Sequence, residues 1–339
     1  MRIAIATDAW SPQVNGVVTT LSQTRDVLES EGHEVRMVTP EGRKTWPLPT
    51  YPEIRLALFQ GGAVQRELDT FDPDCVHIAT EGSLGLAVRR YCLRRKIPFT
   101  TAYHTQFPEY VRARFPIPIS WTTRLLKWFH GPATRTMVPT ESMRQTLQRS
   151  GFDEVVIWTR GVLTDVFKPD NPFPYELPKP IWVYVGRVAV EKNIEAFLDL
   201  SLPGSKVIIG DGPDRESLTN AHSDCHFFGY KFGEELVSLI AGADVFVFPS
   251  RTDTFGIVML EAMACGLPVA AYPVTGPVDV IKPGITGILD DDLAAACTQA
   301  LELNRTDCRS FAESRSWLRS THQFVANLAP RRPVAVVES

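Results

Sequence analysis

Residues 245–269 read VFVFPSRTDTFGIVMLEAMACGLPV. The first four, Val245–Phe248, are β-branched or aromatic and are typical of a short buried strand. A polar loop follows, and from Phe255 the residues favour a helix that ends before Gly266. Val269 then begins a second apolar run. This order of strand, helix and strand predicts a βαβ unit, and therefore a parallel sheet covered by helices.

The same alternation extends in both directions along the chain. On the N-terminal side, a helix is predicted over Gly16–Ser30, between strands at Arg2–Thr7, Glu34–Thr39, Cys75–Ala79 and Phe99–Tyr103. On the other side, strands are predicted at Ile181–Val185, Lys206–Ile209, His226–Phe228, Val245–Phe248 and Val269–Tyr272. The two series predict an α/β protein with two Rossmann-like, doubly wound parallel sheets.

A proline-rich segment separates the two series. Residues 168–180 read KPDNPFPYELPKP, with five prolines that stop both helix and strand. We therefore predict an N-terminal domain over 1–167, a linker over 168–180 and a C-terminal domain over 181–311. A last helix over 312–328 is predicted to cross back to the N-terminal domain. In such sheets ligands bind beyond the carboxyl ends of the strands, so the expected site lies in a cleft between the domains.

The composition is that of a globular protein and narrows the functional classes. Hydrophobic residues make up 44% of the 339 residues, and no apolar run has the ~20 residues that span a bilayer. The first residues lack the features of a signal peptide, and the six cysteines form no C-x-x-C pair. We therefore expect buried thiols and a cytoplasmic location.

Two carboxylates stand out in the 245–269 segment. Asp253 lies in the loop after the strand, and Glu261 lies in the helix beside apolar neighbours. A carboxylate on an apolar face is costly unless it accepts hydrogen bonds, for which the vicinal hydroxyls of a ribose are suitable donors. The alternative is a capping aspartate and a solvent-facing glutamate, which fits Asp253 better than Glu261.

Two cations follow the first strand of the C-terminal series. Arg187 ends that strand, and Lys192 is predicted to lie at the start of the next helix, where a cation opposes the helix dipole unless an anion is bound. A diphosphate suits a forked guanidinium together with a compact ammonium. The alternative is a surface ion pair, for example between Lys192 and Glu195.

Glycines mark two further turns after strands. Gly16 lies where the first helix begins, so its backbone can approach a phosphate, although a plain tight turn is an equal explanation. Gly210 and Asp211 begin the turn GDGP, which lacks the third glycine of a dinucleotide fingerprint and read alone is an ordinary turn.

Taken together, these residues resemble the donor site of the family-four retaining glycosyltransferases, which have the GT-B fold. The resemblance rests on R-x4-K at 187–192 and on D-x7-E at 253–261, and it extends from Met1 to about Phe324. In the family the first acid of the second motif is usually glutamate. The shorter aspartate found here would change the shape of the sugar pocket, so the resemblance does not identify the hexose.

The resemblance implies a role for each matching residue. Arg187 and Lys192 would bind the pyrophosphate, Asp253 the sugar hydroxyls and Glu261 the ribose, while Gly16 would approach the pyrophosphate by its backbone. The turn with Gly210 and Asp211 would lie near the nucleotide, and His104 would line the sugar pocket at the end of an N-terminal strand. The remaining residues of the donor pocket would be Thr254, Phe255, Gly256, Ile257 and Val258.

A basic region in the N-terminal half points to the acceptor. Between Leu84 and Arg149 there are twelve basic and two acidic residues, a local charge of +10. Within it, residues 120–130 predict a helix that carries aromatic and basic side chains on one side, as in helices that bind anionic membranes. A core helix with buried tryptophans is the alternative. The expected membrane- or acceptor-facing residues are Arg89, Arg90, Arg94, Arg95, Trp121, Arg124, Lys127 and Trp128.

Neither acidic cluster in the chain predicts a metal site. Asp72 and Asp74 form a D-x-D pattern but read as a turn before a strand, and Asp290–Asp292 read as a helix cap. We predict neither an obligatory metal nor a cofactor.

The expected activity is a retaining, metal-independent transfer of a hexosyl unit from a nucleotide-diphosphate sugar to a membrane lipid such as diacylglycerol. UDP-glucose or UDP-glucuronate is favoured as donor, with GDP-mannose possible, and the enzyme is expected to be peripheral on the inner face of the membrane. Other hypotheses are a soluble or polysaccharide acceptor, a nucleotide-sugar epimerase, and a non-catalytic protein that binds nucleotide sugars or nucleic acid. The nucleic-acid hypothesis gives no reason for Arg187, Lys192 and Glu261, so no nucleic-acid partner is expected.

Overall fold

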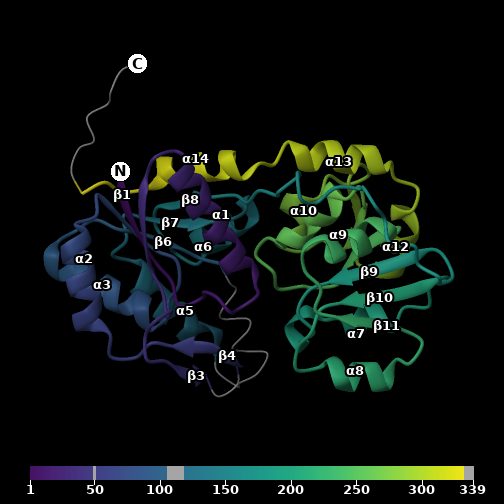
Figure 1. Cartoon of the computed structure of the whole chain (residues 1–339), viewed down its shortest axis with the longest axis horizontal. Helices are drawn as coiled ribbons and strands as arrows, with labels where there is room; N and C mark the ends of the chain where they lie inside the picture. The colour runs from purple at the N-terminus through teal and green to yellow at the C-terminus, as the bar shows by residue number, and fades with distance from the viewer. Residues whose placement is uncertain (49–50, 105–117, 332–339) are drawn as a thin grey trace. The chain divides into compact units, whose positions relative to one another are not determined.

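The computed structural model describes residues 1–48, 51–104 and 118–331. It divides into two compact units (Figure 1). The first contains Met1–Thr159 and the segment from Trp317 onward, and the second contains Arg160–Ser316. Each unit is built around one six-stranded parallel sheet, as the alternation of strands and helices predicts.

The sheet of the first unit has the order β2-β1-β5-β6-β7-β8. Its strands are β1 (Arg2–Ala6), β2 (Glu34–Val38), β5 (Cys75–Ile78), β6 (Thr100–Ala102), β7 (Arg135–Val138) and β8 (Val155–Ile157). A separate antiparallel hairpin is formed by β3 (Trp46–Leu48) and β4 (Tyr51–Leu56). The strand order reverses between β1 and β5, so the loops after these two strands diverge there and leave room for a ligand.

Helices cover both faces of this sheet. Ile3 and Ile5 of β1 belong to a different apolar cluster from Ala4 and Ala6, because successive strand residues point to opposite faces. The helices of the first unit are α1 (Gly16–Ser30), α2 (Gly61–Phe71), α3 (Ser83–Arg95), α5 (Ile119–His130), α6 (Glu141–Arg149) and α14 (Trp317–Asn327).

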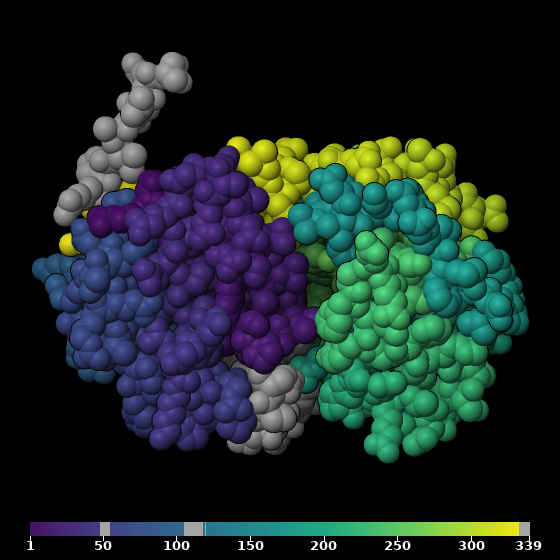
Figure 2. Space-filling model, in the orientation of Figure 1, coloured from purple at the N-terminus to yellow at the C-terminus, as the bar shows by residue number. Residues whose placement is uncertain are grey.

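The last helix, α14, belongs to the first unit although it follows the whole second unit in sequence. Its Phe324 is fully buried, with its ring 4.7 Å from that of Trp158 and 4.9 Å from that of His77. Figure 2 shows the yellow surface of α14 directly beside the purple surface of α1. The C-terminal helix therefore completes the apolar core of the N-terminal sheet.

The second unit has the strand order β11-β10-β9-β12-β13-β14. Its strands are β9 (Ile181–Val185), β10 (Ser205–Ile209), β11 (His226–Gly229), β12 (Val245–Phe248), β13 (Val269–Ala271) and β14 (Gly287–Leu289). The central strand β9 is buried along its whole length, which explains its unbroken apolar sequence. Here the order reverses between β9 and β12, so the loops after these strands frame the expected ligand position.

The helices of the second unit alternate with its strands along the chain, and α12 and α13 follow the last strand. They are the 3₁₀ turn η1 (Val190–Lys192), α7 (Glu195–Leu198), α8 (Arg215–Ala221), α9 (Gly233–Gly242), α10 (Ile257–Ala264), α11 (Pro277–Val280), α12 (Leu293–Ala300) and α13 (Arg305–Glu313). Residues 160–167, which the sequence analysis assigns to the N-terminal domain, lie with this unit. They are held there by Arg309 of α13, whose guanidinium donates hydrogen bonds to the carbonyls of Thr164 and Phe167 at 3.0 and 2.6 Å.

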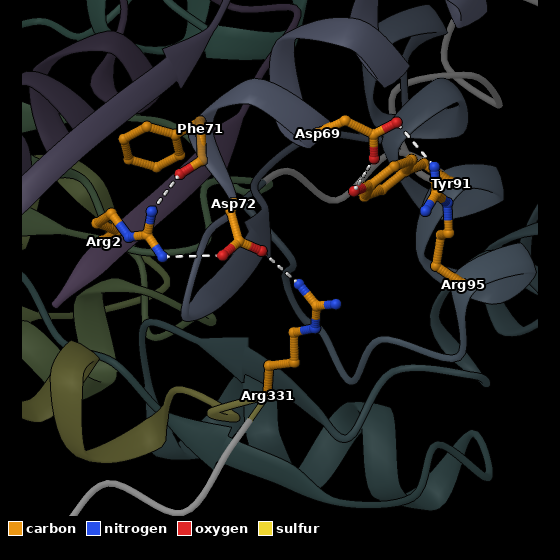
Figure 3. A network of polar contacts seen from close by, with 7 residues as sticks. All are labelled: Arg2, Asp69, Phe71, Asp72, Tyr91, Arg95 and Arg331. Atoms are coloured by element: carbon orange, nitrogen blue, oxygen red, sulfur yellow. Dashed lines mark hydrogen bonds and ion pairs between the residues drawn. The ribbon is translucent and has the colours of Figure 1, made fainter.

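The D-x-D pattern is structural, as its position before a strand predicts (Figure 3). Asp72 ends α2 in a left-handed conformation, and its carboxylate pairs with Arg2 at 3.0 Å and with Arg331 at 2.7 Å. Asp74 accepts a hydrogen bond from the backbone of Arg2 at 2.7 Å. The second acidic cluster is a helix cap, also as predicted, because Asp292 accepts hydrogen bonds from the first amides of α12.

Candidate functional site

The loops after β9 and β12 bring one predicted cation and one predicted carboxylate together. The Lys192 ammonium donates to Oδ1 of Asp253 at 2.5 Å, and the two side chains are 21% and 15% exposed. The ion-pair partner of Lys192 is therefore Asp253, and not Glu195, which the sequence left open as an alternative. Lys192 also does not start a helix, because Asn193 adopts a left-handed conformation (φ 53°) and ends the 3₁₀ turn.

Two more hydrogen bonds tie the same two loops. The Asn193 side-chain amide donates to the carbonyl of Pro249 at 3.0 Å, and the Thr252 hydroxyl donates to the carbonyl of Glu191 at 3.2 Å. Neither Asn193 nor Thr252 was predicted from the sequence to be part of the site. Because three contacts cross between the loops, the positions of Lys192 and Asp253 are fixed by the surrounding backbone and not only by their own ion pair.

Arg187 lies in the loop directly after β9 and is half-buried. Its carbonyl accepts a hydrogen bond from the Tyr184 hydroxyl at 2.9 Å, which fixes the backbone at this point. Arg187 and Lys192 thus belong to one loop at the carboxyl edge of the sheet, beside the reversal in strand order.

The turn with Gly210 and Asp211 supports this loop. Gly210 has φ of +145°, and a Cβ placed there would lie 1.9 Å from the carbonyl oxygen of Gly186. Val188 donates from its amide to the carbonyl of Asp211 at 2.9 Å. The Asp211 carboxylate accepts from Gly212 and from Arg215, both at 2.8 Å. In the structure this turn packs against the loop that carries Arg187 and holds it in place, which agrees with its interpretation as a structural turn.

We expect the substitution Gly210→Ala to destabilise the second unit and weaken nucleotide binding. The added methyl would collide with the Gly186 carbonyl and displace the loop that carries Arg187. A suitable control is Gly233→Ala, since Gly233 also has a positive φ (+55°) but open space around its Cβ position. Urea unfolding should show Gly210→Ala to be roughly 1–3 kcal/mol less stable than the control; equal stabilities would contradict the prediction.

The second carboxylate, Glu261, lies one turn into α10 and is half-buried between buried neighbours. The helix begins at Ile257, later than predicted, because Gly256 has φ of +82° and is not helical. Burial raises the pKa of the Glu261 carboxyl to about 7, and no group of the described residues offsets this effect. A ligand that donates hydrogen bonds to this carboxylate would stabilise its ionised form.

The five residues before Glu261 that were expected to line the donor pocket differ in exposure. Thr254, Phe255 and Ile257 are buried, while Gly256 and Val258 are partly exposed. A Cβ at Gly256 would lie 2.8 Å from the ring of Phe248, so this glycine is also needed for packing. The first amides of α10 have no partner within the helix, and they are the groups of this segment that suit an anion.

The two expected site residues of the first unit lie at the carboxyl ends of its strands. His104 follows β6, is half-buried, and has its ring 5.6 Å from that of Trp158. Gly16 is exposed at the start of α1, but the side chain of Asn15 already accepts hydrogen bonds from Val17 and Val18, both at 3.0 Å. The helix cap is therefore supplied by Asn15, which the sequence analysis did not single out.

The helix α5 exposes the aromatic residues that its sequence singles out. Trp121 and Trp128 are 73% and 54% exposed, and Arg124 and Lys127 are exposed beside them. The opposite side, with Leu126 and Phe129, packs into the core. The alternative of a core helix with buried tryptophans is therefore wrong.

The basic residues of α3 separate into two kinds. Arg89 is buried, and its guanidinium donates to the carbonyls of Phe129 and Trp128 at 2.9 and 2.7 Å while stacking on the Trp128 ring. Its assignment as a membrane-facing cation is wrong, because it caps the end of α5. Arg95 pairs with Asp69 at 2.7 Å, and Arg90 and Arg94 are exposed. Arg112 and Arg114 of the same basic region lie outside the described residues.

The second unit thus carries two cations and two carboxylates in the loops and helix that follow β9 and β12. Cations on the first loop suit a diphosphate, and carboxylates on the second suit hydroxyl groups. Among the described residues, no group of three histidine, cysteine or acidic side chains is arranged to hold a metal ion. None of the described helices is long and apolar enough to cross a membrane.

Comparison with known proteins agrees with this chemistry. The sequence matches Glycosyltransferase Family 4 over residues 14–166 and Glycosyl transferases group 1 over residues 179–303. It is 32% identical over 321 residues to a GDP-mannose-dependent alpha-mannosyltransferase of Mycobacterium tuberculosis, covering 85% of this chain and 83% of that protein. It is 29% identical over 320 residues to the alpha-monoglucosyldiacylglycerol synthase of Acholeplasma laidlawii, covering 79% of each.

Among solved structures, the sucrose-phosphate synthase of Thermosynechococcus elongatus has the same fold. The TM-score is 0.75 at 20% identity, covering 96% of this chain and 97% of that chain. The chain has two six-stranded parallel sheets, matches both family descriptions and is similar to the mannosyltransferase over most of its length. It is therefore a family-four glycosyltransferase with the GT-B fold, an enzyme that uses a nucleotide sugar.

Proposed function

We propose that this enzyme transfers a hexosyl unit, with retention, from a nucleotide-diphosphate sugar to a hydroxyl group of a membrane lipid. The observation that carries the lipid acceptor is the exposed face of α5, where Trp121, Leu125 and Trp128 stand beside Arg124 and Lys127. Indole rings beside cations favour the boundary between lipid headgroups and acyl chains.

A hollow beside α5 also favours binding to an anionic lipid surface. It is wide and shallow, with a volume of about 650 Å³, and is lined by Ser120, Thr123, Arg124, Lys127, Trp128 and Ser150. Hydroxyl groups and two cations around an indole fit a phosphate-bearing headgroup, since phosphate accepts hydrogen bonds and attracts cations. The monoglucosyldiacylglycerol synthase relative, by its name, makes a glycolipid.

The donor is proposed to bind the second unit. Arg187 and Lys192 hold the diphosphate, Asp253 binds the hexose and the ionised Glu261 accepts hydrogen bonds from the ribose. In the transfer, the bond from the anomeric carbon to the diphosphate oxygen breaks and a bond to the acceptor oxygen forms. The acceptor proton passes to the departing diphosphate, and the two cations stabilise the charge that develops there. His104, at the carboxyl end of β6, is proposed as a sugar-binding residue of the first unit, as the family resemblance implies.

A donor and acceptor survey tests the proposal. The full chain is incubated with labelled UDP-glucose, UDP-glucuronate or GDP-mannose, each with phosphatidylglycerol vesicles containing dioleoylglycerol, and lipid products are separated by chromatography. We expect one nucleotide sugar to give a labelled glycolipid. Label only in water-soluble oligosaccharide would favour a soluble acceptor, and a changed sugar without acceptor would indicate an epimerase; either result would overturn the proposal.

Vesicle flotation tests the membrane surface separately. We expect the double substitution of Trp121 and Trp128 by serine to reduce binding to phosphatidylglycerol vesicles by about 10-fold or more, because two exposed indoles are lost. Trp46→Ser is the control, since Trp46 is an exposed tryptophan of the same unit outside α5. Equal losses for the two proteins would contradict a specific role of α5.

A further inference from the structure

The reversal of strand order in the first unit frames a second place at which a ligand can bind. Two carboxylates lie there, Asp8 in the loop after β1 and Glu81 in the loop after β5. Neither was singled out from the sequence. The two carboxylates differ in how many hydrogen bonds they accept from the protein, and this number indicates which of them can bind a ligand.

Asp8 is fully used by the protein. Its carboxylate accepts hydrogen bonds from the hydroxyls of Thr80 and Ser83 at 3.2 and 2.9 Å and from the amides of Leu84 and Gly85 at 3.0 and 3.3 Å. It thereby caps α3, whose own preceding residue, Gly82, has no side chain to do so. Because Asp8 fixes both Thr80 and Ser83, Glu81, which lies between them with Gly82, is on a well-anchored stretch of backbone.

Only one of the two carboxylate oxygens of Glu81 has a hydrogen-bond partner among the described residues. Among the described residues, its carboxylate has one contact, from Nε2 of His130 to Oε1 at 3.2 Å, and the side chain is 31% exposed. A carboxylate has several acceptor positions and no donor, so the remaining oxygen, on a partly exposed side chain, is open to a donor from a ligand in place of water. A hydroxyl group is such a partner.

His130 is built to hold Glu81 in place. Its side chain is buried at the end of α5, with the rings of Phe129, Phe152 and Tyr103 at 5.1, 6.0 and 6.2 Å. Its Nδ1 lies 2.9 Å from the hydroxyl of Thr101. Since the carboxylate only accepts, Nε2 must carry the proton, and in the neutral tautomer Nδ1 then accepts from Thr101.

The chain of hydrogen bonds continues into the sheet. The hydroxyl of Thr136 on β7 lies 3.1 Å from that of Thr101 on β6. With His130 in its neutral tautomer, the donation runs from Thr136 to Thr101, to His130 and to Glu81. A chain of this kind orients its last member and leaves the outer oxygen of Glu81 as the free acceptor at the carboxyl edge of the sheet.

We infer that Glu81 binds a hydroxyl group of the sugar acceptor, and that His130 is the residue that positions Glu81. The inference rests on the proposed function, in which the donor occupies the second unit and the acceptor the first. It requires an acceptor with a free hydroxyl group, and together with the proposed role of α5 it favours a glycerol-based lipid.

The test compares Glu81→Gln with the unsubstituted protein, using the donor and vesicle lipid that give the highest rate in the survey. Glutamine keeps the length and an oxygen for His130 but removes the charge. We expect KM for the acceptor lipid to rise by about 10- to 100-fold, since a hydrogen bond to a charged group is lost. KM for the nucleotide sugar and its slow hydrolysis by water should change by less than about twofold.

Glu141→Gln is the matched control. Glu141 also lies at the carboxyl edge of this sheet and is 46% exposed, but Arg144 and Gln145 already satisfy its oxygens. It should leave both KM values unchanged. Thr101→Val removes the hydrogen bond to His130 and should raise the acceptor KM by a smaller factor than Glu81→Gln, with the donor KM unchanged.

Each outcome separates the possibilities. An acceptor KM of Glu81→Gln within twofold of the unsubstituted value would overturn the inference and leave the proposed function standing. An equal loss of transfer and hydrolysis, with a lower melting temperature, would show that Glu81 only supports the fold, and would also overturn it. If the unsubstituted protein transfers no sugar to any lipid, the proposed function fails and the inference with it.

Discussion

Replacing Lys192 by methionine is expected to lower kcat for glycosyl transfer by roughly 10²- to 10³-fold, the usual effect of losing one group that stabilises developing charge. Lys192 is proposed to lie beside the departing diphosphate, and no neighbouring side chain of its loop can supply a second ammonium. Methionine keeps most of the apolar stem, so the change is mainly one of charge. Single-turnover and steady-state rates with a labelled nucleotide sugar measure the effect.

The substitution also leaves Asp253 without its ammonium partner, so some loss of stability is expected. Lys231→Met controls for this. Lys231 is 24% exposed, close to the 21% of Lys192, and it pairs with Glu235 at 2.5 Å in the loop after β11 of the same unit. We expect the control to keep its rate within about threefold. A rate of Lys192→Met equal to that of the control would show that Lys192 serves only as an ion-pair partner.

The second large effect is a pH dependence produced by Glu261. The folded protein holds the pKa of this carboxyl at about 7, against an ordinary value of 4.5. Between these values the folded state binds more protons than the unfolded state, so stability falls as the pH rises from 4.5 to 7 and then levels off. Glu261→Gln cannot ionise and should be more stable than the unsubstituted protein at pH 8, by up to about 3 kcal/mol, but not at pH 4.5.

The same substitution should weaken binding of the nucleotide sugar by about 10- to 100-fold at pH 8, because the ionised carboxylate accepts hydrogen bonds from the ribose. In the unsubstituted protein the affinity should decline as the pH falls below 7, and in Glu261→Gln it should be flat over that range. Urea unfolding and titration calorimetry at pH 5, 6, 7 and 8 measure the two effects. Glu216→Gln, an exposed position on α8, should change neither; a Glu261→Gln protein with an unchanged affinity would remove Glu261 from the donor site.

The sequence predicts the strongly patterned elements well. The helix Gly16–Ser30 and the strands Ile181–Val185 and Val245–Phe248 have the predicted bounds. The strands that were missed are short or atypical. The missed strands β7, β8 and β14 have four, three and three residues, too few for a period to show clearly, and both strands of the β3–β4 hairpin contain a proline.

Contacts between distant segments account for most of what the sequence could not show in the site. The spacing singles out Lys192 and Asp253 separately, but their pairing depends on two loops 61 residues apart in the chain. For the same reason Arg89 was assigned to the surface, because nothing in its own helix shows that the last carbonyls of α5 lie within reach. Glu81 and His130 carry no local motif at all, and only the fold brings them together.

The return of α14 to the first unit has a consequence for synthesis on the ribosome. Domains generally fold as units while the chain emerges. The second unit is continuous in sequence, whereas the face of Trp158 and His77 stays uncovered until Phe324 has been made. We therefore expect the C-terminal half to reach its native state first, and the N-terminal half to be completed only when the last helix leaves the exit tunnel.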